Sequence, residues 1–422
     1  MSAAWFEIAR DSDFPLDNLP YGAFVREGDG ESRLGVALGD AVVDLHALGW
    51  AGLFDAALPD ARSALCAANL NPLLSRGAVA WHAVRARLKA LLCDGNDEIA
   101  DARLTQALIA RRDVRLVLPF AVGDYVDFYS SLEHATNLGR ILRPGGEPLL
   151  PNWRWLPIGY HGRAGTVVCS GTPIVRPRGQ TKTPTAGAPS FGPTRMLDFE
   201  LELGFVTGDG PALGASITPE RAHDYIFGVA LLNDWSARDI QGWEYQPLGP
   251  FLGKSFASSL GSWVVPLDAL EPYRVSGPRQ EPPPLPYLAL DGAHGYDIAL
   301  DATMASAQMR EERMAAQTIA RTNLRDMYWS MAQQLAHATS NGASVRAGDL
   351  FGSGTISGSE PGSYGSMIEL TWRGEHPLAL ADGTQRAFLE DGDELTLHGV
   401  AQTGRKPRIG LGEVSGIVLP AR

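Results

Sequence analysis

The run MLDFELELGFV, residues 196–206, alternates apolar and acidic side chains with a period of two. This period is typical of a β-strand, in which successive side chains point to opposite faces. One face carries only leucine and phenylalanine, while the other carries Asp198, Glu200 and Glu202, spaced about 6.6 Å apart at roughly 3.3 Å per residue. A solvated strand face usually mixes lysine, serine and threonine among its acids, and here no cation interrupts them. We therefore favour a site for a hard divalent cation, Mg²⁺ or Ca²⁺, over a solvated face.

A second acidic signal stands at the end of an apolar run. The run IFGVALL is followed at once by Asn233 and Asp234. This pattern predicts a buried strand with polar side chains at its exit. Asp234 taken alone is a turn or cap residue about as often as a ligand. Three further polar side chains, Arg238, Gln241 and Lys254, follow on what we interpret as one irregular connection.

One short segment places Asp127, Tyr129 and His134 within eight residues. Histidine titrates near neutral pH unaided, so it is the default general base. A lone histidine is more often structural, and His134 gains weight only from the acidic segments elsewhere in the chain. Glu369 lies in an alternating run, residues 367–372, which predicts a half-buried strand, and it is a candidate partner for a histidine.

The run GSGTISGS at residues 352–359 is rich in glycine and serine. Its backbone N–H groups are of the kind that bind an oxyanion, although such runs usually only turn the chain. The spacing excludes a phosphate-binding loop, because no Gly-Lys-Ser/Thr follows the first glycine at the required distance. We keep the run as a candidate oxyanion-binding segment.

The chain, at 422 residues, is too long for one hydrophobic core, because such cores stop growing at roughly 250–300 residues. Before Leu118-Pro119 the sequence is rich in alanine, with helical patches. After it, glycine, proline, tryptophan and tyrosine punctuate short apolar runs. We predict a small N-terminal domain, residues 1–118, and a larger, mainly β C-terminal domain, residues 119–422.

Three helices are expected within this mainly β chain. A second-domain helix is predicted from Leu324, opened by Asn323 and ended by Asn341-Gly342. A shorter helix is predicted at Pro219, which follows a threonine of the capping type. The N-terminal helix carries an apolar stripe at spacings of three and four: Trp81, Val84, Leu88 and Leu91.

Charge and cysteine usage limit the partners and the compartment. The formal net charge of -12 disfavours a nucleic acid or an anionic membrane as partner, since both require clustered lysine and arginine. No apolar run reaches the roughly 18 residues of a membrane helix. The N-terminal segment is acidic where a secretory signal is basic and then apolar, so none is expected. Cys66, Cys93 and Cys169 are odd in number and widely spaced, which predicts a reducing compartment, the cytoplasm.

Five segments together resemble the fumarylacetoacetate hydrolase family. They are DYVDFYSSLEHATN, LPNWRWLPIGYHGRAG, RMLDFELELGF, NDWSARDIQGWEYQPLGPFLGKSF and SGTISGS. FPLDNLPYGAF, at residues 14–24, is similar to the N-terminal domain of that family, so the resemblance covers essentially the whole chain. It implies a mainly β fold with some α, made of an N-terminal SH3-like barrel domain and a C-terminal mixed β-roll domain, and it implies a homodimer.

The resemblance also implies roles for single side chains. His134 is similar to the general base, with Glu369 orienting it. Asp198 is not among the cation ligands, which corrects the expectation that all three strand acids bind metal. A second cation site is implied near Lys254 and Ser258, where the family carries threonine instead of Ser258. The implied ligands of the main cation, Ca²⁺ or Mg²⁺, are Asp127, Glu200, Glu202 and Asp234. The groups that resemble stabilisers of developing negative charge are Arg238, Gln241 and Lys254. The positions that match substrate contacts are Tyr129, Arg143, Tyr160, Gln241, Tyr245 and Thr355.

The reaction that the resemblance implies is hydrolysis of a carbon–carbon bond in a small anionic β-diketo acid. The substrate would be 4-fumarylacetoacetate and the products fumarate and acetoacetate, in the last step of tyrosine and phenylalanine degradation. A carbon leaving group is prohibitive unless it departs as an enolate, and a β-diketone supplies one. Arg143 would neutralise a substrate carboxylate, which reconciles an anionic substrate with an acidic protein.

Two other hypotheses stay open. A metal-dependent decarboxylase, isomerase or hydratase of a related keto acid would keep the cation and change the reaction. A decarboxylase needs no group to activate water, which is the task that suits His134. A binding or scaffold protein would hold a structural cation, but such a site has no need of His134, Lys254 and Arg238 gathered beside it.

Overall fold

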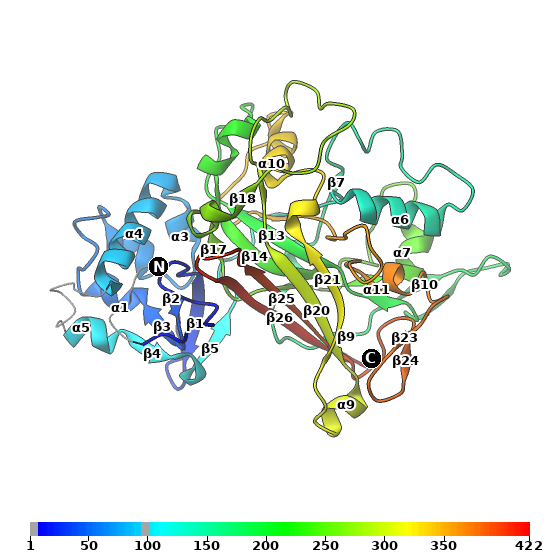
Figure 1. The fold of residues 1–422 in the computed structure, drawn as a ribbon, viewed down its shortest axis with the longest axis horizontal. Helices are drawn as coiled ribbons and strands as arrows, with labels where there is room; N and C mark the ends of the chain where they lie inside the picture. The colour runs from blue at the N-terminus through cyan, green and yellow to red at the C-terminus, as the bar shows by residue number, and fades with distance from the viewer. Residues whose placement is uncertain (1–6, 94–101) are drawn as a thin grey trace.

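The computed structural model describes residues 7–93 and 102–422. The first six residues of the N-terminal segment, in which no secretory signal was expected, lie outside the described residues. The N-terminal residues, drawn in blue and cyan, form one end of the molecule beside the sheets that make up the rest (Figure 1). No helix in the two described ranges is both long and apolar enough to cross a membrane. All three cysteines are free thiols.

The N-terminal part is a five-stranded antiparallel sheet, in the order β4-β3-β2-β1-β5, with short helices packed against it. The stripe predicted from the sequence lies in α4, where Trp81, Val84, Leu88 and Leu91 are all buried, so this helix is confirmed. The five strands end before Leu118, the predicted domain boundary, which itself stays a prediction. The strands are β1 (Tyr21–Arg26), β2 (Ser32–Leu38), β3 (Ala41–Asp44), β4 (Leu108–Ala110) and β5 (Val114–Val117). The helices are α1 (Leu45–Trp50), α2 (Ala61–Leu65), α3 (Asn71–Leu74), α4 (Gly77–Leu92), α5 (Ala102–Gln106) and the 3-10 turn η2 (Arg111–Asp113).

An eight-stranded mixed sheet forms the centre of the molecule. Its main path runs β7-β6-β22-β13-β14-β16-β8, and β17 pairs with β14 beside it. The β22–β6 and β16–β8 pairs are parallel, and the other pairs are antiparallel. The strands are β6 (Tyr125–Phe128), β7 (Gly159–His161), β8 (Val167–Cys169), β13 (Leu201–Thr207), β14 (Ile226–Asp234), β16 (Ser258–Leu260), β17 (Val265–Pro266) and β22 (Leu350–Gly352).

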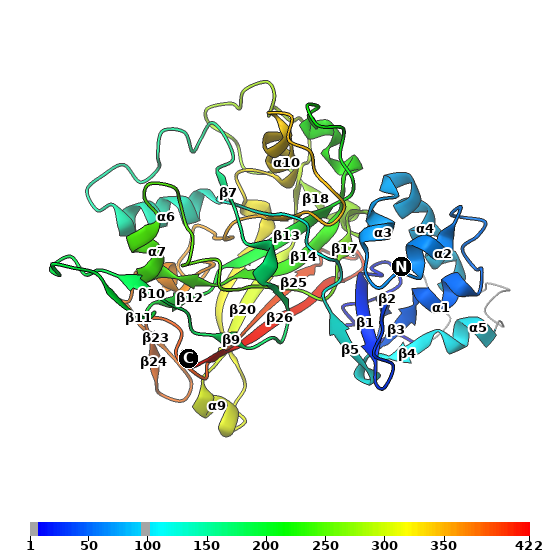
Figure 2. The same ribbon diagram turned by 180° about the vertical axis from the view of Figure 1, so that it is seen from behind.

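A second large sheet has five strands in the order β21-β20-β25-β26-β9, and seen from behind it runs past the C-terminus (Figure 2). Its strands are β9 (Ile174–Val175), β20 (Ala299–Ala305), β21 (Gln317–Asn323), β25 (Glu394–Ala401) and β26 (Ile409–Leu419). Four small ladders are β10 (Arg178–Thr181) with β11 (Ser190–Pro193), β12 (Leu197–Asp198) with β15 (Ser236–Ala237), β18 (Arg274–Val275) with β19 (Gly295–Tyr296), and β23 (Leu378–Ala379) with β24 (Gln385–Arg386). The helices after residue 119 are α6 (Leu132–Leu142), α7 (Arg238–Glu244), α8 (Leu267–Leu270), α9 (Ala307–Glu311), α10 (Met331–Thr339) and α11 (Met367–Leu370), with 3-10 turns η3 (Ala164–Thr166), η4 (Pro219–Asp224), η5 (Glu271–Tyr273) and η6 (Leu324–Asp326).

The central sheet is buried on both faces, so β13 and β14 have no exposed position. Leu203 and Leu231 on one face belong to the core that includes the strands of the second large sheet. Leu232 on the other face shares a core with the N-terminal part, where Trp81 of α4 meets Phe227 edge-on with ring centroids 5.3 Å apart. A sheet covered on both faces explains the continuous apolar run of β14. The predicted mainly β fold with some α is confirmed.

The predicted strand at residues 196–206 is interrupted. β12 ends at Asp198 and pairs with β15, while β13 begins at Leu201 and pairs with β14 and β22. Between them the Leu201 N–H donates to the carbonyl of Gly365. The chain thus changes partners at Phe199, and Asp198 leaves the face that Glu200 and Glu202 share.

Two of the secondary-structure predictions after residue 300 were wrong. The helix expected from Leu324 begins at Met331, because Ser330 and Gln333 form a reciprocal capping box and Leu324 lies in the separate turn η6. The strand expected around Glu369 is the one-turn helix α11. The short helix expected at Pro219 is present as the 3-10 turn η4, with Thr218 in the N-cap position.

We expect His398 to stabilise the second large sheet in a pH-dependent way. His398 of β25 lies directly across from Asp301 of β20 and Glu413 of β26, with nitrogen–oxygen distances of 3.3 and 3.7 Å. Its contacts with Asp301 and Glu413 raise the pKa of His398 to about 9. Because the folded pKa is raised, the stabilisation is complete below about pH 6.5, the ordinary histidine value, and disappears as the pH rises through about 9. The three side chains are well exposed, so we expect less than about 1 kcal/mol.

The measurement is the melting temperature of the wild type and His398→Gln from pH 6 to pH 10. The wild type should be the more stable at pH 6, and the difference should vanish by pH 10. A difference that stays constant over this range would contradict the ion pair.

Candidate active site

Four buried carboxylates meet across neighbouring strands of the central sheet, in which β22 lies between β6 and β13, and β14 follows β13. Asp127 comes from β6, Glu200 stands directly before β13, Glu202 lies in β13, and Asp234 ends β14. Each offers one oxygen, and these oxygens all lie within 4.8 Å of one another. All four side chains are buried, so the hypothesis of a solvated acidic face is wrong. Asp198 lies outside this group, as the family resemblance implied.

Gly352 makes the close approach of two of these carboxylates possible. It stands in β22, which pairs with β6 on one side and β13 on the other. A Cβ at this position would lie 2.6 Å from Asp127 Oδ1 and 3.0 Å from Glu202 Oε2. Only glycine leaves that space to the two carboxylates.

The carboxylate group fits a divalent cation. Asp127 Oδ1 and Glu202 Oε1 are buried and have no hydrogen-bond partner among the residues that the structure describes. Burial, and then the negative charge of neighbouring carboxylates, raises the pKa of both groups well above the ordinary range. Unpaired buried oxygens with like charges at close range are costly unless a cation neutralises them. Oxygen donors of this kind suit a hard cation.

Two basic side chains border the carboxylates. Lys254 Nζ donates to Glu200 Oε2 at 2.5 Å and to Asp234 Oδ2 at 2.7 Å, and Arg238 Nη1 lies 2.7 Å from Glu200 Oε1. Burial alone would raise the pKa of Glu200, but Lys254 and Arg238 hold it below its ordinary value. Burial likewise opposes the charge of Lys254, yet Asp234 and Glu200 raise its pKa. Glu200 is therefore an anion whose two oxygens already have cationic partners.

His134, in the first turn of α6, forms a buried pair with Glu369 of α11. Nδ1 of the imidazole lies 2.6 Å from Glu369 Oε2. Burial raises the pKa of Glu369, but His134, Ser366 and Asn137 outweigh burial and lower it. An ionised Glu369 only accepts hydrogen bonds, so we assign the proton to Nδ1 and leave Nε2 free to take one. A positive charge on His134 would also lower the pKa of Glu200, so the imidazole lies within electrostatic range of that carboxylate.

The residues predicted to touch substrate are only partly brought together. The ring of Tyr129 meets His134 edge-on, with centroids 5.4 Å apart, and Tyr160 donates to Asp234 Oδ2 at 3.0 Å. Thr355 is buried, and its hydroxyl has no hydrogen-bond partner within residues 7–93 and 102–422, as expected of a group that binds a ligand. Arg143 donates to the Pro148 carbonyl at 2.6 Å and its charge acts on Tyr129. Tyr245 is exposed at the end of α7, and its hydroxyl accepts from Gln246.

Ser258 and Gln241 each contact a charged side chain of the site. Ser258 Oγ donates to Asp234 Oδ1 at 2.8 Å, and Gln241 Oε1 accepts from Arg238 Nη1 at 3.3 Å. The charged ammonium of Lys254 has no lone pair, so only its backbone carbonyl could serve the predicted second cation site. A cavity of about 190 Å³ reaches this region and is lined in part by Tyr160, Asp234, Lys254 and Ser258.

The Gly/Ser-rich run at residues 352–359 does not offer the free N–H groups expected of an oxyanion-binding segment. The Gly354 N–H donates to Glu202 Oε2 at 3.2 Å, and the N–H of Ile356 donates to the carbonyl of Leu201. The Ser353 and Gly358 N–H groups are also taken by backbone carbonyls. At these four positions the prediction was wrong, because the run ties β22 to β13 instead.

Several side chains of the site were missed by sequence reasoning. Tyr125 lies beside the carboxylates and stands two residues before Asp127 on the same strand, so the period of two could have found it. Asn137 donates to Glu369 Oε1 at 3.0 Å and lies one helical turn after His134, a spacing that puts both on one face. Ser357 and Ser366 donate to Glu369 Oε2 at 3.0 and 2.6 Å. Ser357 stands in the Gly/Ser-rich run but was given no role of its own, and no sequence signal marked Ser366.

We expect Glu369→Gln to lower kcat by roughly 10²-fold while KM changes little. A neutral amide no longer fixes the Nδ1 proton of His134 or stabilises the positive imidazolium, and losing such an orienting partner costs on this order. Steady-state kinetics on the purified variant make the test. Glu375→Gln, an exposed change six residues away, is the control and should keep wild-type kcat. A Glu369→Gln enzyme as fast as the wild type would show that the pair is only structural.

Fold and site together define an enzyme of mainly β structure in which buried carboxylates suit a divalent cation beside a histidine–glutamate pair. A family model described as Fumarylacetoacetate (FAA) hydrolase C-terminal matches residues 125–418, and one described as Fumarylacetoacetase N-terminal matches residues 17–119. The chain belongs to the fumarylacetoacetate hydrolase family.

Full-length relatives agree with this assignment. The chain is 46% identical over 421 residues to the fumarylacetoacetase of Homo sapiens, covering 99% of both chains. It is 47% identical over 423 residues to that of Caenorhabditis elegans, again covering 99% of each. Among solved structures, a fumarylacetoacetate hydrolase from Exiguobacterium antarcticum shares 18% identity and a TM-score of 0.52, over 96% of this chain and 100% of that chain, which is a likeness of fold alone.

Proposed function

We propose that this protein hydrolyses 4-fumarylacetoacetate to fumarate and acetoacetate, the reaction that closes tyrosine and phenylalanine degradation. The observation that carries the proposal is the buried group of four carboxylates beside the His134–Glu369 pair. Support comes also from the relatives, which are fumarylacetoacetases along their whole length.

His134 takes the first proton in this scheme. With Nδ1–H donated to Glu369, Nε2 removes a proton from water, and the resulting hydroxide attacks the ketone carbonyl carbon at the fumaryl end of the substrate. The bond from that carbon to the neighbouring methylene then breaks, and its electron pair leaves on the methylene carbon as an enolate. The imidazolium returns the proton, so that acetoacetate and fumarate are released.

Fixed charges next to the carboxylates stabilise the negative charge that develops. Lys254 and Arg238 are held by Glu200, Asp234 and Asp198, so they need not reorganise during the reaction. Losing one such preorganised donor typically costs about 3 kcal/mol of barrier. Gln241 belongs to the same group through Arg238. We assign substrate positioning to Tyr129, Arg143, Tyr160, Gln241, Tyr245 and Thr355.

Asp127, Glu200, Glu202 and Asp234 would hold the divalent cation, and we propose Mg²⁺ or Ca²⁺ because all four donors are oxygens. When bound there, the cation supplies Lewis-acid polarisation of the substrate carbonyls. A second cation near Lys254 and Ser258 remains part of the proposal.

A decarboxylase, isomerase or hydratase of a related keto acid is not favoured. His134 is placed for proton transfer by Glu369, which is itself held by Asn137 and by Ser366. A decarboxylase has no use for a base placed in this way, and the full-length relatives, which are fumarylacetoacetases, weigh against an isomerase or a hydratase.

The test follows the loss of diketone ultraviolet absorbance with fumarylacetoacetate and with related diketo acids, with and without chelator. We expect turnover of fumarylacetoacetate that chelator abolishes and that Mg²⁺ or Ca²⁺ restores. Decarboxylation without cleavage, seen as carbon dioxide release with no fumarate, would favour the alternative.

We also propose a homodimer and a reducing compartment, the cytoplasm. The homodimer follows from the family, and light scattering in solution should give twice the chain mass of 45.3 kDa. The three free thiols support the compartment, because paired cysteines are usual where the environment oxidises.

A further inference from the structure

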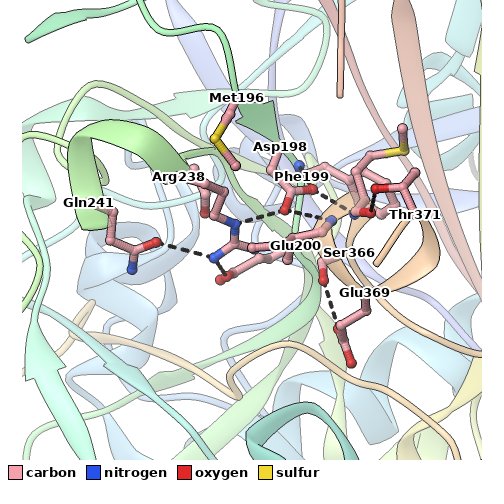
Figure 3. A network of polar contacts seen from close by, with 12 residues as sticks. Met196, Asp198, Phe199, Glu200, Arg238, Gln241, Ser366, Glu369 and Thr371 are labelled. Atoms are coloured by element: carbon pink, nitrogen blue, oxygen red, sulfur yellow. Dashed lines mark hydrogen bonds and ion pairs between the residues drawn. The ribbon is translucent and has the colours of Figure 1, made fainter. Parts of the chain in front are cut away.

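Asp198 is a buried carboxylate that the proposed reaction does not use directly. It is fully buried between α7 and α11, and Figure 3 shows it between Arg238 and the turn that carries Ser366 and Glu369. Four donors converge on it within 3.1 Å. Cation binding does not explain the position of Asp198, since Asp198 lies outside the group of four carboxylates.

One side of Asp198 holds Arg238. Oδ2 accepts from Arg238 Nε at 2.7 Å, while Nη1 of the same guanidinium lies 2.7 Å from Glu200 Oε1. The guanidinium is thereby fixed at two edges, and Asp198 sets its distance from the cation ligands.

The other side of Asp198 holds the helix that carries Glu369. Oδ1 accepts from the Met367 N–H at 2.6 Å, and Oδ2 accepts from the Ile368 N–H at 3.1 Å. These are the first two residues of α11, and Glu369 is the third. Any movement of this turn changes the hydrogen bond from His134 to Glu369.

We propose that Asp198 is a positioning residue that joins Arg238 and the His134–Glu369 pair in one rigid frame. The assignment rests on the proposed function for the roles of Arg238 and His134. The frame keeps the base that activates water at a fixed separation from the charge that stabilises the product of its attack. A misplacement of about 1 Å between such groups can cost 10²-fold in rate.

Asp198→Asn tests the frame, because an amide has the same shape but only one accepting oxygen. Whichever oxygen the NH₂ of asparagine replaces, this NH₂ faces another donor, either Arg238 Nε–H or an N–H of α11. One side of the frame therefore loses its hydrogen bond. We expect kcat to fall about 10²-fold, with KM within about threefold of the wild type because Asp198 touches no predicted substrate contact. We also expect the proton resonance of His134 Nδ1–H, assigned by its absence in His134→Asn, to shift or broaden.

Asp393→Asn is the matched control. Asp393 is equally buried and accepts from Arg386 Nε and Nη2 at 2.9 and 3.0 Å and from the Glu390 N–H at 2.8 Å, outside the site. Asp393→Asn should lose about as much thermal stability as Asp198→Asn, but it should keep the wild-type kcat and the wild-type His134 resonance. An equal loss of kcat in the two variants, or unchanged kcat in folded Asp198→Asn, would overturn the proposal.

Asp198→Glu keeps the test decisive if Asp198→Asn does not fold. The longer carboxylate can still reach Arg238 but displaces α11, so kcat should fall about tenfold and the resonance should shift. If Asp198→Glu keeps the wild-type kcat and the wild-type His134 resonance, Asp198 has only a structural role. If the wild type does not cleave fumarylacetoacetate, the proposed function fails by itself, and the resonance alone decides: a shift supports the frame and its absence overturns it.

Discussion

His134→Asn should lower kcat by about 10³-fold or more, while the affinity for Mg²⁺ or Ca²⁺ should stay within about threefold of the wild type. General-base catalysis by a positioned side chain contributes roughly 10²- to 10⁴-fold. The asparagine amide can replace Nδ1–H as the donor to Glu369, so the buried glutamate keeps a partner, but nothing replaces Nε2. No oxygen of the carboxylate group is touched, which is why cation binding should persist.

Stopped-assay kinetics and calorimetric titration of the cation make this measurement. The control is His398→Gln, since His398 lies on the second large sheet and outside the site. A folded His134→Asn enzyme with wild-type kcat would remove His134 as the base, and loss of cation affinity in that variant would show that the imidazole is a ligand.

Glu202→Gln should weaken cation binding by at least about 10²-fold, since loss of even an outer partner costs 10- to 100-fold. Its amide oxygen can still accept from the Gly354 N–H, so the local backbone contact survives. We expect turnover at low cation concentration to fall in parallel and to recover in part at high concentration.

The same variant should be more stable than the wild type without cation. Burial and the neighbouring carboxylates raise the pKa of Glu202, so its ionised form is unfavourable in the empty site. Replacing it with a neutral amide removes that repulsion. Cation should then stabilise the wild type strongly, by about 2.7 kcal/mol at a concentration of 100 Kd, and the variant weakly.

Thermal melts with chelator and with added cation separate these effects. Asp393→Asn provides the contrast, because it removes a carboxylate that Arg386 already pairs and should destabilise the protein in both conditions. A Glu202→Gln protein that is less stable without cation, and whose cation affinity is unchanged, would contradict a cation site at these carboxylates.

The sequence predicted local structure well wherever the apolar pattern followed the burial of a single element. The helix α4 was found from its one-sided apolar stripe, and the strand β14, which is buried on both faces, from its continuous apolar run. The start of α10 was missed although its signal, Ser330 followed by Gln333, stands in the sequence. The apolar residues before Ser330 lie in η6 and in the buried segment that follows it. Their spacing is that of a helix, so the predicted helix began too early. For the segment around Glu369, alternation over six residues did not distinguish a strand from a single helical turn.

The residues of the candidate site also fall into two groups: those that a local sequence pattern revealed and those that it did not. Glu200 and Glu202 were found by the period of two and Asp234 by its place at a strand exit. His134 was a candidate base from its chemistry alone, while Asp127 and the basic groups received roles only from the family resemblance. Ser357 and Ser366 donate to Glu369 from a loop and its exit, and no sequence pattern pointed to this contact. Their part in the site depends on how that loop folds back.

By itself, the sequence determined the chemistry of the side chains, the alternation that puts Glu200 and Glu202 on one face, and the family. The tertiary structure decided that Asp127 and Asp234 join them, because the pairing of β6 with β22 and of β13 with both β22 and β14 brings distant segments into contact. It also decided that Asp198 leaves that face and turns to Arg238 and α11. Alternation is a property of neighbouring residues, whereas strand partners and buried faces are set by contacts between segments far apart in the chain.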